Sequence, residues 1–458
     1  MKSWHIVGIC GIGMSALAQF AAAMDIKVSG SDRALENPEN SSLKAMLQAQ
    51  GIELFPQDGS CFAPGNPPVD AVIYSTAIEE SNPDFAASCG IERIHRAAAL
   101  RDLIVERSAA AGKVSVAVAG SCGKTSTTAL IAEALCNLNG DAESINGGMI
   151  KAFAQNNYPG NYRPGSGALI FEADESDKSL LAFHPDYAIV LNIGTDHYPK
   201  AELAEMFAAF VNQAQKGAVL QQEVYDLINK ELRSDLTVRV FNTPVNYRSG
   251  NGVSSADFGD GVFRQLPSPG RHTAANVSAA WELLKLMQFA PEDALNAALN
   301  THGVARRFDF KGRTAKGCAV YDDYAHNPEK VTNMIAAAQE LCPDGRLWIL
   351  FQPHGYGPLG FMQQELGRQL AAVLRSSDRF MLAEPYYAGG TSSFSPHASE
   401  VLENWKKLYP AAPLELWESR PAAQKLLQSQ AAVNDLILVM GARDNTLMDF
   451  ARQLTGQA

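Results

Sequence analysis

The stretch VSVAVAGSCGKTSTTAL combines residue types that suit the binding of a nucleoside triphosphate. A β-rich run leads into Gly120, Gly123, Lys124 and Thr125, and a helical sequence follows. Glycines let backbone N–H groups close around phosphate oxygens, a lysine supplies charge for the outer phosphates, and a threonine hydroxyl can ligate Mg²⁺ at a helix N-terminus. Val118 stands where the longer Walker pattern has another glycine, so the match is to the shortened GxxGK[ST] form. A helix-capping loop is the alternative, and the flanking strand and helix favour nucleotide binding.

An acidic group follows a second predicted strand. In FEADESD the carboxylates of Glu172, Asp174, Glu175 and Asp177 crowd together. Such carboxylates repel one another unless a cation or a basic partner lies among them, and Mg²⁺ is a natural cation for oxygen ligands. A solvated acidic loop is the alternative. Because a nucleotide-binding loop is predicted on the same sheet, we expect Glu172 to bind Mg²⁺.

A third polar group, in LNIGTDHYP, places Asn192, Asp196 and His197 beyond a buried strand. A lone histidine is usually structural, but α/β sheets bind ligands at the carboxyl ends of their strands. His197 is therefore a candidate ligand for a second Mg²⁺, or a group that orients phosphate.

The N-terminal stretch GICGIGMSA resembles a dinucleotide-binding turn. It offers Gly8, Gly11 and Gly13, with Ala16 on the following helix and Asp32 at a fitting distance. Alone, this pattern suggests NAD. The underlying physics is only a pyrophosphate on a helix N-terminus, which a UDP-sugar satisfies equally well.

These motifs need elements that hold them at the edge of a sheet. Short apolar runs alternate with longer stretches of helical periodicity, which is typical of parallel α/β units. This pattern occurs in three successive segments of the chain. We predict a Rossmann-like domain over residues 1–108, a P-loop ATPase-like domain over 109–312 and a doubly wound domain over 313–458. A polar stretch over 244–271 is expected to form small strands and loops. The predicted strands are 5–9, 27–29, 71–74, 114–119, 169–171, 188–192, 319–322, 347–351, 380–383 and 436–440, and the predicted helices include 14–24, 275–287 and 328–341.

Composition narrows the class of protein. The chain has 458 residues, of which 46% are hydrophobic and 19% charged, so folded domains are expected throughout. The formal net charge of -11 and the absence of a Lys/Arg cluster argue against a nucleic-acid partner. Seven cysteines without metal-like spacing predict reduced thiols. No signal-peptide pattern or run of 18 apolar residues is present, so a cytoplasmic protein without membrane insertion is expected.

Taken together, the motifs resemble the Mur ligases of peptidoglycan synthesis, most closely the branch of UDP-N-acetylmuramate–alanine ligase and the murein tripeptide-recycling ligase. The resemblance covers nearly the whole chain. Its landmarks occur in family order: HIVGICGIGMSALA, SGSD, STAI, GSCGKTSTT, FEADESD, NIGTDH, GRHTAAN, RRFDF, DDYAHNP, FQPH and GARD. The set is far more specific than any one motif, and it implies a three-domain α/β Mur ligase architecture.

The resemblance also implies roles for residues on these motifs. Lys124, Glu172 and His197 would be catalytic, and Thr125, Glu172 and His197 would bind Mg²⁺. The residues implied in ATP binding are Gly120, Ser121, Cys122, Gly123, Lys124, Thr125, Ser126, His272, Asn276, Arg307, Asp323 and His326. Those implied in UDP-sugar binding are Gly11, Ile12, Gly13, Met14, Ser31, Asp32, Ser75 and Thr76.

The implied reaction joins an amino acid, L-alanine before others, to UDP-N-acetylmuramate with ATP and Mg²⁺. The muramyl carboxylate attacks the γ-phosphate to form an acyl phosphate, and the incoming amine then displaces phosphate. Because three domains would contribute to one site, closure on binding ATP and the UDP-sugar is expected; small-angle scattering that shows no compaction with both ligands would contradict it. Oligomeric state is not indicated.

The sequence departs from the family where an acceptor would bind. Alanine-adding enzymes continue FQPH into HRYxRT, whose arginines suit a carboxylate, whereas this chain has HGYGPLGF with Gly355 and Pro358 at those places. NIGTDHYPKA also lacks the family's acidic residue after the histidine. The acceptor could therefore be a short peptide, as in a recycling ligase. A homologue that binds the UDP-sugar without ligation is the second hypothesis, and an NAD-dependent oxidoreductase is a distant third.

Overall fold

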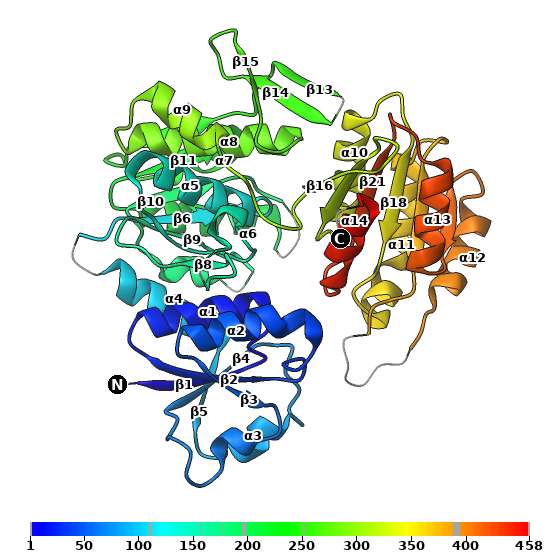
Figure 1. Ribbon diagram of the computed structural model, residues 1–458. Coiled ribbons are helices and arrows are strands. Elements are labelled where there is room, and N and C mark those ends of the chain that lie inside the picture. Colours follow the sequence, from blue (N-terminus) through cyan, green and yellow to red (C-terminus); the bar gives the residue numbers. More distant parts are fainter. Residues whose placement is uncertain are drawn as a thin grey trace. The chain divides into compact units, whose positions relative to one another are not determined.

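A computed structural model describes residues 2–109, 112–155, 157–176, 178–194, 198–250, 252–387 and 394–456. The chain folds into two compact units, which are Met1–Thr243 with Ala275–Ala305, and Pro244–Ala274 with Arg306–Ala458. Each unit is an α/β assembly built on largely parallel sheets (Figure 1). Among the described residues, no helix has the length and apolarity needed to cross a membrane. All seven cysteines are free thiols.

The first sheet of the larger unit is wholly parallel, in the order β3-β2-β1-β4-β5. Its strands are β1 (Ser3–Val7), β2 (Lys27–Asp32), β3 (Glu53–Pro56), β4 (Ala71–Tyr74) and β5 (Glu92–His95). Its helices are α1 (Ile12–Ala23), α2 (Ser41–Ala49), α3 (Pro83–Ala87) and α4 (Arg96–Ser108), with short 3-10 turns η1 (Pro38–Asn40) and η2 (Ser60–Phe62). The order of the strands reverses between β1 and β4, which is the position where open α/β sheets generally bind ligands.

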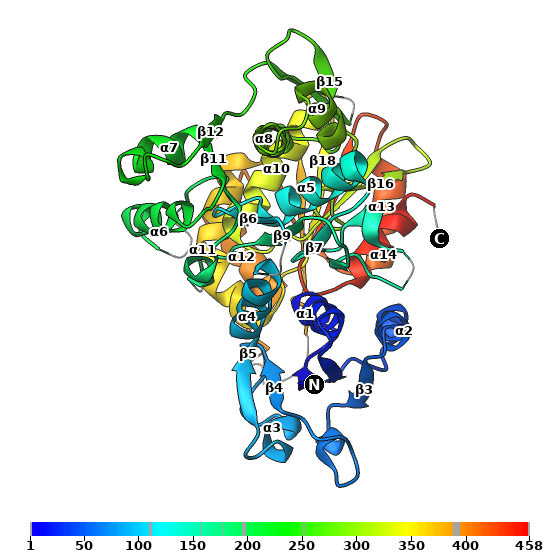
Figure 2. The ribbon, with the colours of Figure 1, turned by 90° about the vertical axis from the view of Figure 1, so that its left-hand side faces the viewer.

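The second sheet of this unit has the order β12-β11-β10-β6-β9-β7-β8, and only β8 is antiparallel to its neighbour. Its strands are β6 (Ser115–Ala119), β7 (Glu143–Ile145), β8 (Tyr162–Arg163), β9 (Leu169–Glu172), β10 (Tyr187–Val190), β11 (Gly217–Gln221) and β12 (Val238–Phe241). The main helices are α5 (Lys124–Asn139), α6 (Lys200–Asn212), α7 (Gln222–Ile228), α8 (Arg271–Leu286) and α9 (Pro291–Leu299). Figure 2 shows α7 beside β11 and β12. Central strand β6 is buried along its whole length.

The smaller unit holds an antiparallel three-stranded sheet and a six-stranded sheet of order β16-β17-β21-β18-β19-β20. The small sheet consists of β13 (Tyr247–Gly250), β14 (Val253–Asp257) and β15 (Phe263–Gln265), which confirms the strands expected in that polar stretch. The larger sheet consists of β16 (Asp309–Arg313), β17 (Ala319–Asp323), β18 (Leu347–Phe351), β19 (Arg379–Ala383), β20 (Leu414–Trp417) and β21 (Leu436–Met440). Only β16 runs antiparallel. Its helices are α10 (Pro328–Leu341), α11 (Tyr356–Val373), α12 (Ala398–Leu408), α13 (Arg420–Gln430) and α14 (Thr446–Leu454).

Two apolar layers enclose this six-stranded sheet. One layer packs Ile349 and Leu438 against α10, α11 and α12, and the other packs Val320 and Ile437 against α13 and α14. Adjacent residues of one strand thus enter opposite cores, as the pleat requires. Strands buried on both faces appear in sequence as continuous apolar runs, which is why 347–351 and 436–440 were predicted with their observed bounds.

The two observed units do not coincide with the three predicted segments. The larger unit contains the first segment and most of the second, while residues 244–274 of the second segment belong to the smaller unit. A cut at residue 312 would split β16, which pairs with β17 from Asp309 to Arg313. The structure places Arg306 and all that follows in the smaller unit. The division into three domains stays a prediction. Helix α8 also begins earlier than predicted, at Arg271.

Candidate active site

The loop between β6 and α5 has the backbone of a phosphate-binding loop. Gly120 and Gly123 have φ of +133° and +85°, conformations that residues with a Cβ rarely adopt. A Cβ at Gly120 would also lie 3.1 Å from the backbone nitrogen of Leu191 on the neighbouring chain segment. The two glycines therefore let the loop turn sharply and lie close against the end of β10. Helix α5 then begins at Lys124, so its N-terminal N–H groups face the loop.

The Lys124 ammonium lies inside this loop. Its Nζ donates to the Gly120 carbonyl at 2.9 Å and to Glu175 Oε2 at 2.7 Å, and Asp174 Oδ1 lies 3.8 Å away. Burial lowers the pKa of Lys124, but Glu175 and Asp174 outweigh this effect, so its pKa stands above the ordinary value. The lysine is therefore charged, and the acidic motif after β9 supplies its counter-charge.

Thr125 and Glu172 meet beside the lysine. Thr125 Oγ1 donates to Glu172 Oε2 at 3.0 Å, and the backbone N–H of Gly147 donates to Glu172 Oε1 at 2.7 Å. Strands β6 and β9 are parallel neighbours, with Val118 paired to Glu172. A hydroxyl and a carboxylate are hard oxygen donors of the kind that Mg²⁺ prefers, so this pair fits the predicted metal site. His197, the third predicted ligand, lies outside the described residues.

Asn192, which follows β10, holds the other side of the loop. Its Oδ1 accepts from the Cys122 N–H at 2.8 Å, and its Nδ2 donates to the Cys122 carbonyl at 2.9 Å. The Gly194 N–H donates to Ser121 Oγ at 2.8 Å. The loop is therefore fixed from both neighbouring strands before any ligand binds. Ser126 is half-buried in the first turn of α5.

Asn276 is the predicted adenine-side residue that the structure brings to the loop. Its Oδ1 lies 3.3 Å from where a Cβ of Gly123 would be. His272 lies in the first turn of the same helix α8, which begins at Arg271. Their contact with adenine stays a prediction.

The N-terminal turn is held by Asp32. Its Oδ2 accepts from the Cys10 N–H at 2.9 Å, and its Oδ1 accepts from the Ala34 N–H at 2.8 Å. Gly11 caps α1, and a Cβ at Gly13 would lie 3.2 Å from Arg96 Nη1. Of the other predicted residues here, Ile12 is half-buried and Met14 is buried. Asp32 thus shapes the turn, while Gly11, the N-cap of α1, is exposed.

Ser75 and Thr76 follow β4, the strand next to β1. Ser75 Oγ accepts from the Ala77 N–H at 3.4 Å, and Thr76 is exposed. Because β1 and β4 are adjacent and parallel, these residues and the glycine turn share one edge of the sheet. Such an edge can hold the pyrophosphate of a UDP-sugar.

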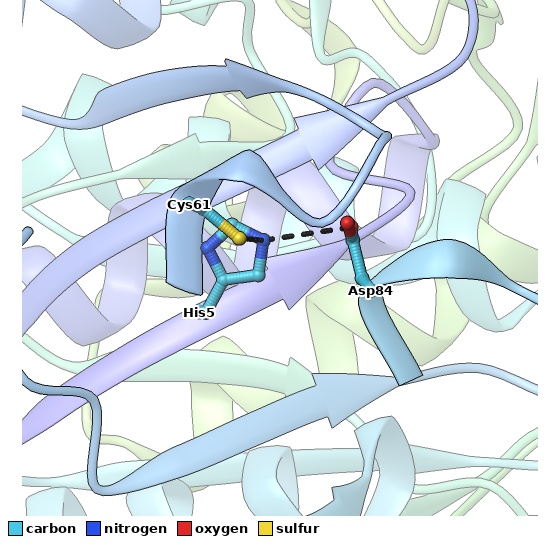
Figure 3. A group of neighbouring side chains, drawn as sticks. All are labelled: His5, Cys61 and Asp84. Carbon is cyan, nitrogen blue, oxygen red and sulfur yellow. Dashed lines mark hydrogen bonds and ion pairs between the residues drawn. The ribbon is translucent and has the colours of Figure 1, made fainter. Parts of the chain in front are cut away.

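The Ser31 side chain does not lie at the glycine turn with the other residues predicted to bind the UDP-sugar. Its hydroxyl donates to Asp84 Oδ2, within a buried group formed by His5, Cys61 and Asp84 (Figure 3). His5 Nε2 lies 3.5 Å from Cys61 Sγ and 3.7 Å from Asp84 Oδ2, and His5 Nδ1 lies 2.9 Å from Ser29 Oγ. The Gly59 N–H donates to Asp84 Oδ1 at 2.8 Å. The group ties β1 and β2 to α3 and η2, so Ser31 supports the sheet and does not expose its hydroxyl at the turn.

The buried carboxylate of Asp84 is expected to make a pH-dependent contribution to the stability of the fold. Burial raises the pKa of Asp84, but hydrogen bonds with His5 and Ser31 outweigh it and hold the pKa below the ordinary value. A carboxyl whose pKa is lowered by folding stabilises the folded state above its unfolded pKa of about 3.9, and this contribution is lost as pH falls through the folded pKa. Asp84→Asn is expected to lower the free energy of unfolding by about 2 kcal/mol at pH 7.

Urea unfolding at pH 7 and at successively lower pH checks this expectation. The difference between the wild type and Asp84→Asn should shrink below about pH 4. Asp102→Asn, which alters an exposed carboxylate on α4, is the matched control and should leave stability within about 0.5 kcal/mol. A difference between Asp84→Asn and the wild type that stays constant with pH would contradict the assignment of the effect to this carboxylate.

The smaller unit holds the remaining predicted ATP contacts at the end of β17. Asp323 is buried, and its two oxygens accept from the N–H groups of Phe308 and Ala325, both at 2.7 Å. Burial raises its pKa. Arg307 lies over the Tyr324 ring at 5.5 Å, and His326 Nδ1 lies 2.9 Å from the Tyr324 carbonyl. Asp323 therefore holds two loops together, while Arg307 and His326 are half-buried beside them.

Sequence reasoning missed several neighbours of these groups. Asn146 Nδ2 donates to the Thr125 carbonyl at 3.2 Å, and Gly148 lies so close that a Cβ would be 3.1 Å from Thr125 Cγ2. The INGG sequence at the end of β7 was the available signal. His354, whose ring lies 5.2 Å from that of His326, and Arg443, in the loop after β21, were not among the residues predicted from the sequence.

Comparison with known proteins identifies the family. Three family profiles match in order: the Mur ligase family catalytic domain over residues 3–107, the Mur ligase middle domain over 118–284, and the Mur ligase glutamate ligase domain over 306–443. UDP-N-acetylmuramate–L-alanine ligase from Saccharopolyspora erythraea is 34% identical over 97% of this chain and 91% of its own length. The enzyme of that name from Synechococcus sp. is 31% identical over 96% and 93%.

Solved structures share the fold along the whole chain. UDP-N-acetylmuramate–alanine ligase from Thermotoga maritima has a TM-score of 0.77 at 24% identity, covering 100% of this chain and 99% of its own. A murein peptide ligase from Psychrobacter arcticus has a TM-score of 0.64 at 20% identity, covering 100% and 98%. Three matched profiles, full-length relatives and a phosphate loop with its acidic partners lead to one conclusion: this chain belongs to the Mur ligase family.

Proposed function

We propose that this protein is an ATP-dependent ligase that joins an amino acid to UDP-N-acetylmuramate through an amide bond, in the cytoplasm, during peptidoglycan synthesis. One observation carries the proposal. Lys124, Thr125 and Glu172 converge at a glycine loop, and no side chain caps the N-terminus of α5, which is the arrangement needed to hold a triphosphate. The relatives named for UDP-N-acetylmuramate and L-alanine support the substrates.

The reaction starts with transfer of the γ-phosphoryl group. The muramyl carboxylate attacks the γ-phosphorus, the bond to the β-phosphate oxygen breaks, and ADP and an acyl phosphate result. Lys124 would leave Glu175 to contact the outer phosphates and offset the charge on their oxygens. Thr125 and Glu172 would hold Mg²⁺, which supplies Lewis-acid neutralisation of the phosphate oxygens.

The second step forms the amide. The amine of the acceptor attacks the acyl carbon, a tetrahedral intermediate forms, and phosphate leaves with the electron pair of the broken C–O bond. The amine loses its protons to water or to a neighbouring base. The phosphoryl transfer therefore converts a poor leaving oxygen into a good one, and the protein contributes mainly positioning and charge.

L-alanine is the proposed acceptor, and a short peptide is the alternative, because a murein peptide ligase has the same fold. The test is phosphate release by purified protein given ATP, Mg²⁺, UDP-N-acetylmuramate and a panel of amino acids and peptides. Turnover that requires the UDP-sugar, Mg²⁺ and one acceptor supports the proposal. Tight UDP-sugar binding without phosphate release for any acceptor would refute it and favour a non-catalytic homologue.

A further inference from the structure

Three residues with basic side chains follow three adjacent strands of the six-stranded sheet at equivalent positions. In the parallel register Met440 of β21 pairs with Asp323 of β17 on one side and Phe351 of β18 on the other. His326, Arg443 and His354 each follow this row by the same number of residues. They therefore leave three adjacent strands at one carboxyl edge, which is where open α/β sheets bind ligands.

Arg443 has no partner of its own within the described chain. Its side chain is exposed, and the described residues offer its guanidinium no hydrogen bond or ion pair. The nearest carboxylates in sequence and register are occupied, since Asp444 pairs with Arg420 at 2.6 Å and Asp323 accepts two backbone N–H groups. An arginine presents a rigid fork of donors that matches a carboxylate, and here the fork is left available.

Hydrogen bonds from Arg306 and from the neighbouring strands fix the backbone of the loop that carries Arg443. Buried Arg306 donates to the carbonyls of Gly441 and Ala442, the latter at 3.1 Å. The Gly441 N–H donates to the Asp323 carbonyl at 3.2 Å, and the Gln352 N–H donates to the Met440 carbonyl at 2.9 Å. The backbone before Arg443 is thus fixed to both neighbouring strands, as a binding residue requires.

His354 and His326 give this edge a neutral, polar character beside the arginine. Burial, together with the neighbouring His326 and the charge of Arg443, lowers the pKa of His354 to about 4. Burial also lowers the pKa of His326, with a contribution from Arg443. The Nδ1 of His354 is buried without a hydrogen-bond partner among the described atoms, so the edge has a polar atom that a ligand could satisfy.

The segment after His354 provides no cation. Helix α11 begins there with Gly355 as its N-cap, and its first residues are Tyr356, Gly357 and Pro358. The arginines that the family resemblance led us to expect are therefore absent from this strand end, and Arg443 on the adjacent strand end is available instead.

We propose that Arg443, with His354 beside it, binds the carboxylate of the incoming acceptor and so selects acceptors that carry one. The inference rests on the proposed ligase function, and it names the group that recognises the second substrate of the ligase. Arg443 acts by holding the acceptor, which places the acceptor's amine for attack. A carboxylate on this guanidinium would make a charge-assisted, two-pronged hydrogen bond.

The test compares L-alanine with L-alaninamide, which keeps the amine and lacks the carboxylate. Wild-type kcat/KM should fall about 100-fold on the amide, because a site built for a carboxylate is left unpaired. Arg443→Ala should lose about 100-fold in kcat/KM for L-alanine and little for the amide, so discrimination collapses. KM values for ATP and the UDP-sugar should stay within about two-fold, and Arg443→Lys should recover part of the preference.

Arg452→Ala is the matched control, because Arg452 lies on α14 just after this loop and pairs with Asp449 at the surface. It should behave like the wild type. If wild-type protein turns over but Arg443→Ala keeps its preference for the acid, the inference is overturned while the ligase function stands. If Arg443→Ala instead raises KM for ATP, the guanidinium serves phosphate, and the inference is again overturned. No turnover by the wild type with any acceptor would remove both proposals.

Discussion

Lys124→Ala is expected to lower ATP-dependent phosphate release by about 1,000-fold. The Lys124 ammonium is the one basic group of the phosphate-binding loop between β6 and α5. It lies among Glu175, Asp174 and the Gly120 carbonyl. Without it, the charge that develops on the phosphate oxygens during phosphoryl transfer has no cation from the loop to offset it. The measurement is steady-state phosphate release with saturating acceptor and UDP-sugar.

Two further variants separate lost chemistry from lost folding. Lys124→Ala leaves Glu175 buried without its partner, at a cost of about 3 kcal/mol in the free energy of unfolding. Adding Glu175→Gln should restore much of that stability without restoring activity. Lys216→Ala removes a lysine that pairs with Asp186 at 2.8 Å at the start of β11, and it should leave the rate unchanged. A folded Lys124→Ala variant with near wild-type turnover would refute the assigned role.

Glu172→Gln is expected to reduce turnover by about 100-fold at millimolar Mg²⁺ and to shift the Mg²⁺ requirement to higher concentration. The amide keeps the shape of the side chain and can still bond Thr125, but it lacks the negative charge that attracts a divalent cation. A titration of turnover with Mg²⁺ checks the result, and Mn²⁺ should rescue part of the activity.

Glu223→Gln is the control for this substitution, because Glu223 forms an exposed pair with Lys200 at the start of α7. Its Mg²⁺ dependence should match the wild type. An unchanged Mg²⁺ midpoint in Glu172→Gln would place the metal elsewhere. In that case Glu172 would serve only to fix Thr125 and the Gly147 N–H.

The sequence revealed the loop because its chemistry is local. Gly120, Gly123 and Lys124 are close together in the chain, and their spacing alone predicts the turn that the structure confirms. The partners of these residues come from pairing between distant strands, such as β6 with β9 and β10. The contact between Lys124 and Glu175 depends on that register. The FEADESD motif therefore predicted a cation among its carboxylates, but it did not show that the cation would be the Lys124 ammonium.

Ser31 shows a different limit. The SGSD motif associates it with Asp32 and the UDP-sugar turn, but neighbouring residues of a strand point to opposite faces. Asp32 bonds the turn, while Ser31 bonds Asp84 beneath the sheet. The alternation was visible in the sequence. What it could not supply was the position of Asp84, which reaches Ser31 only because α3 packs on that face.

Strand β16 was missed because edge strands carry little apolar signal. Its sequence, DFKGR, has one large apolar residue, and Gly312 has a φ of +131° at an irregular register. The stretch therefore resembles a linker and suggested a domain boundary. Only its pairing with β17 shows that it belongs to the sheet.

The chain passes between the two units three times, after Thr243, Ala274 and Ala305. The small sheet β13 to β15 belongs with the later part of the chain, where the Tyr321 hydroxyl donates to the Gly252 carbonyl at 3.1 Å and Arg271 lies 3.6 Å from Glu340. A protease cut between Ala305 and Arg306 would thus yield two fragments that each hold part of the same folded unit. Such fragments should co-migrate on gel filtration under native conditions, and the piece from Arg306 onward, made alone, would lack a sheet that its own core contacts.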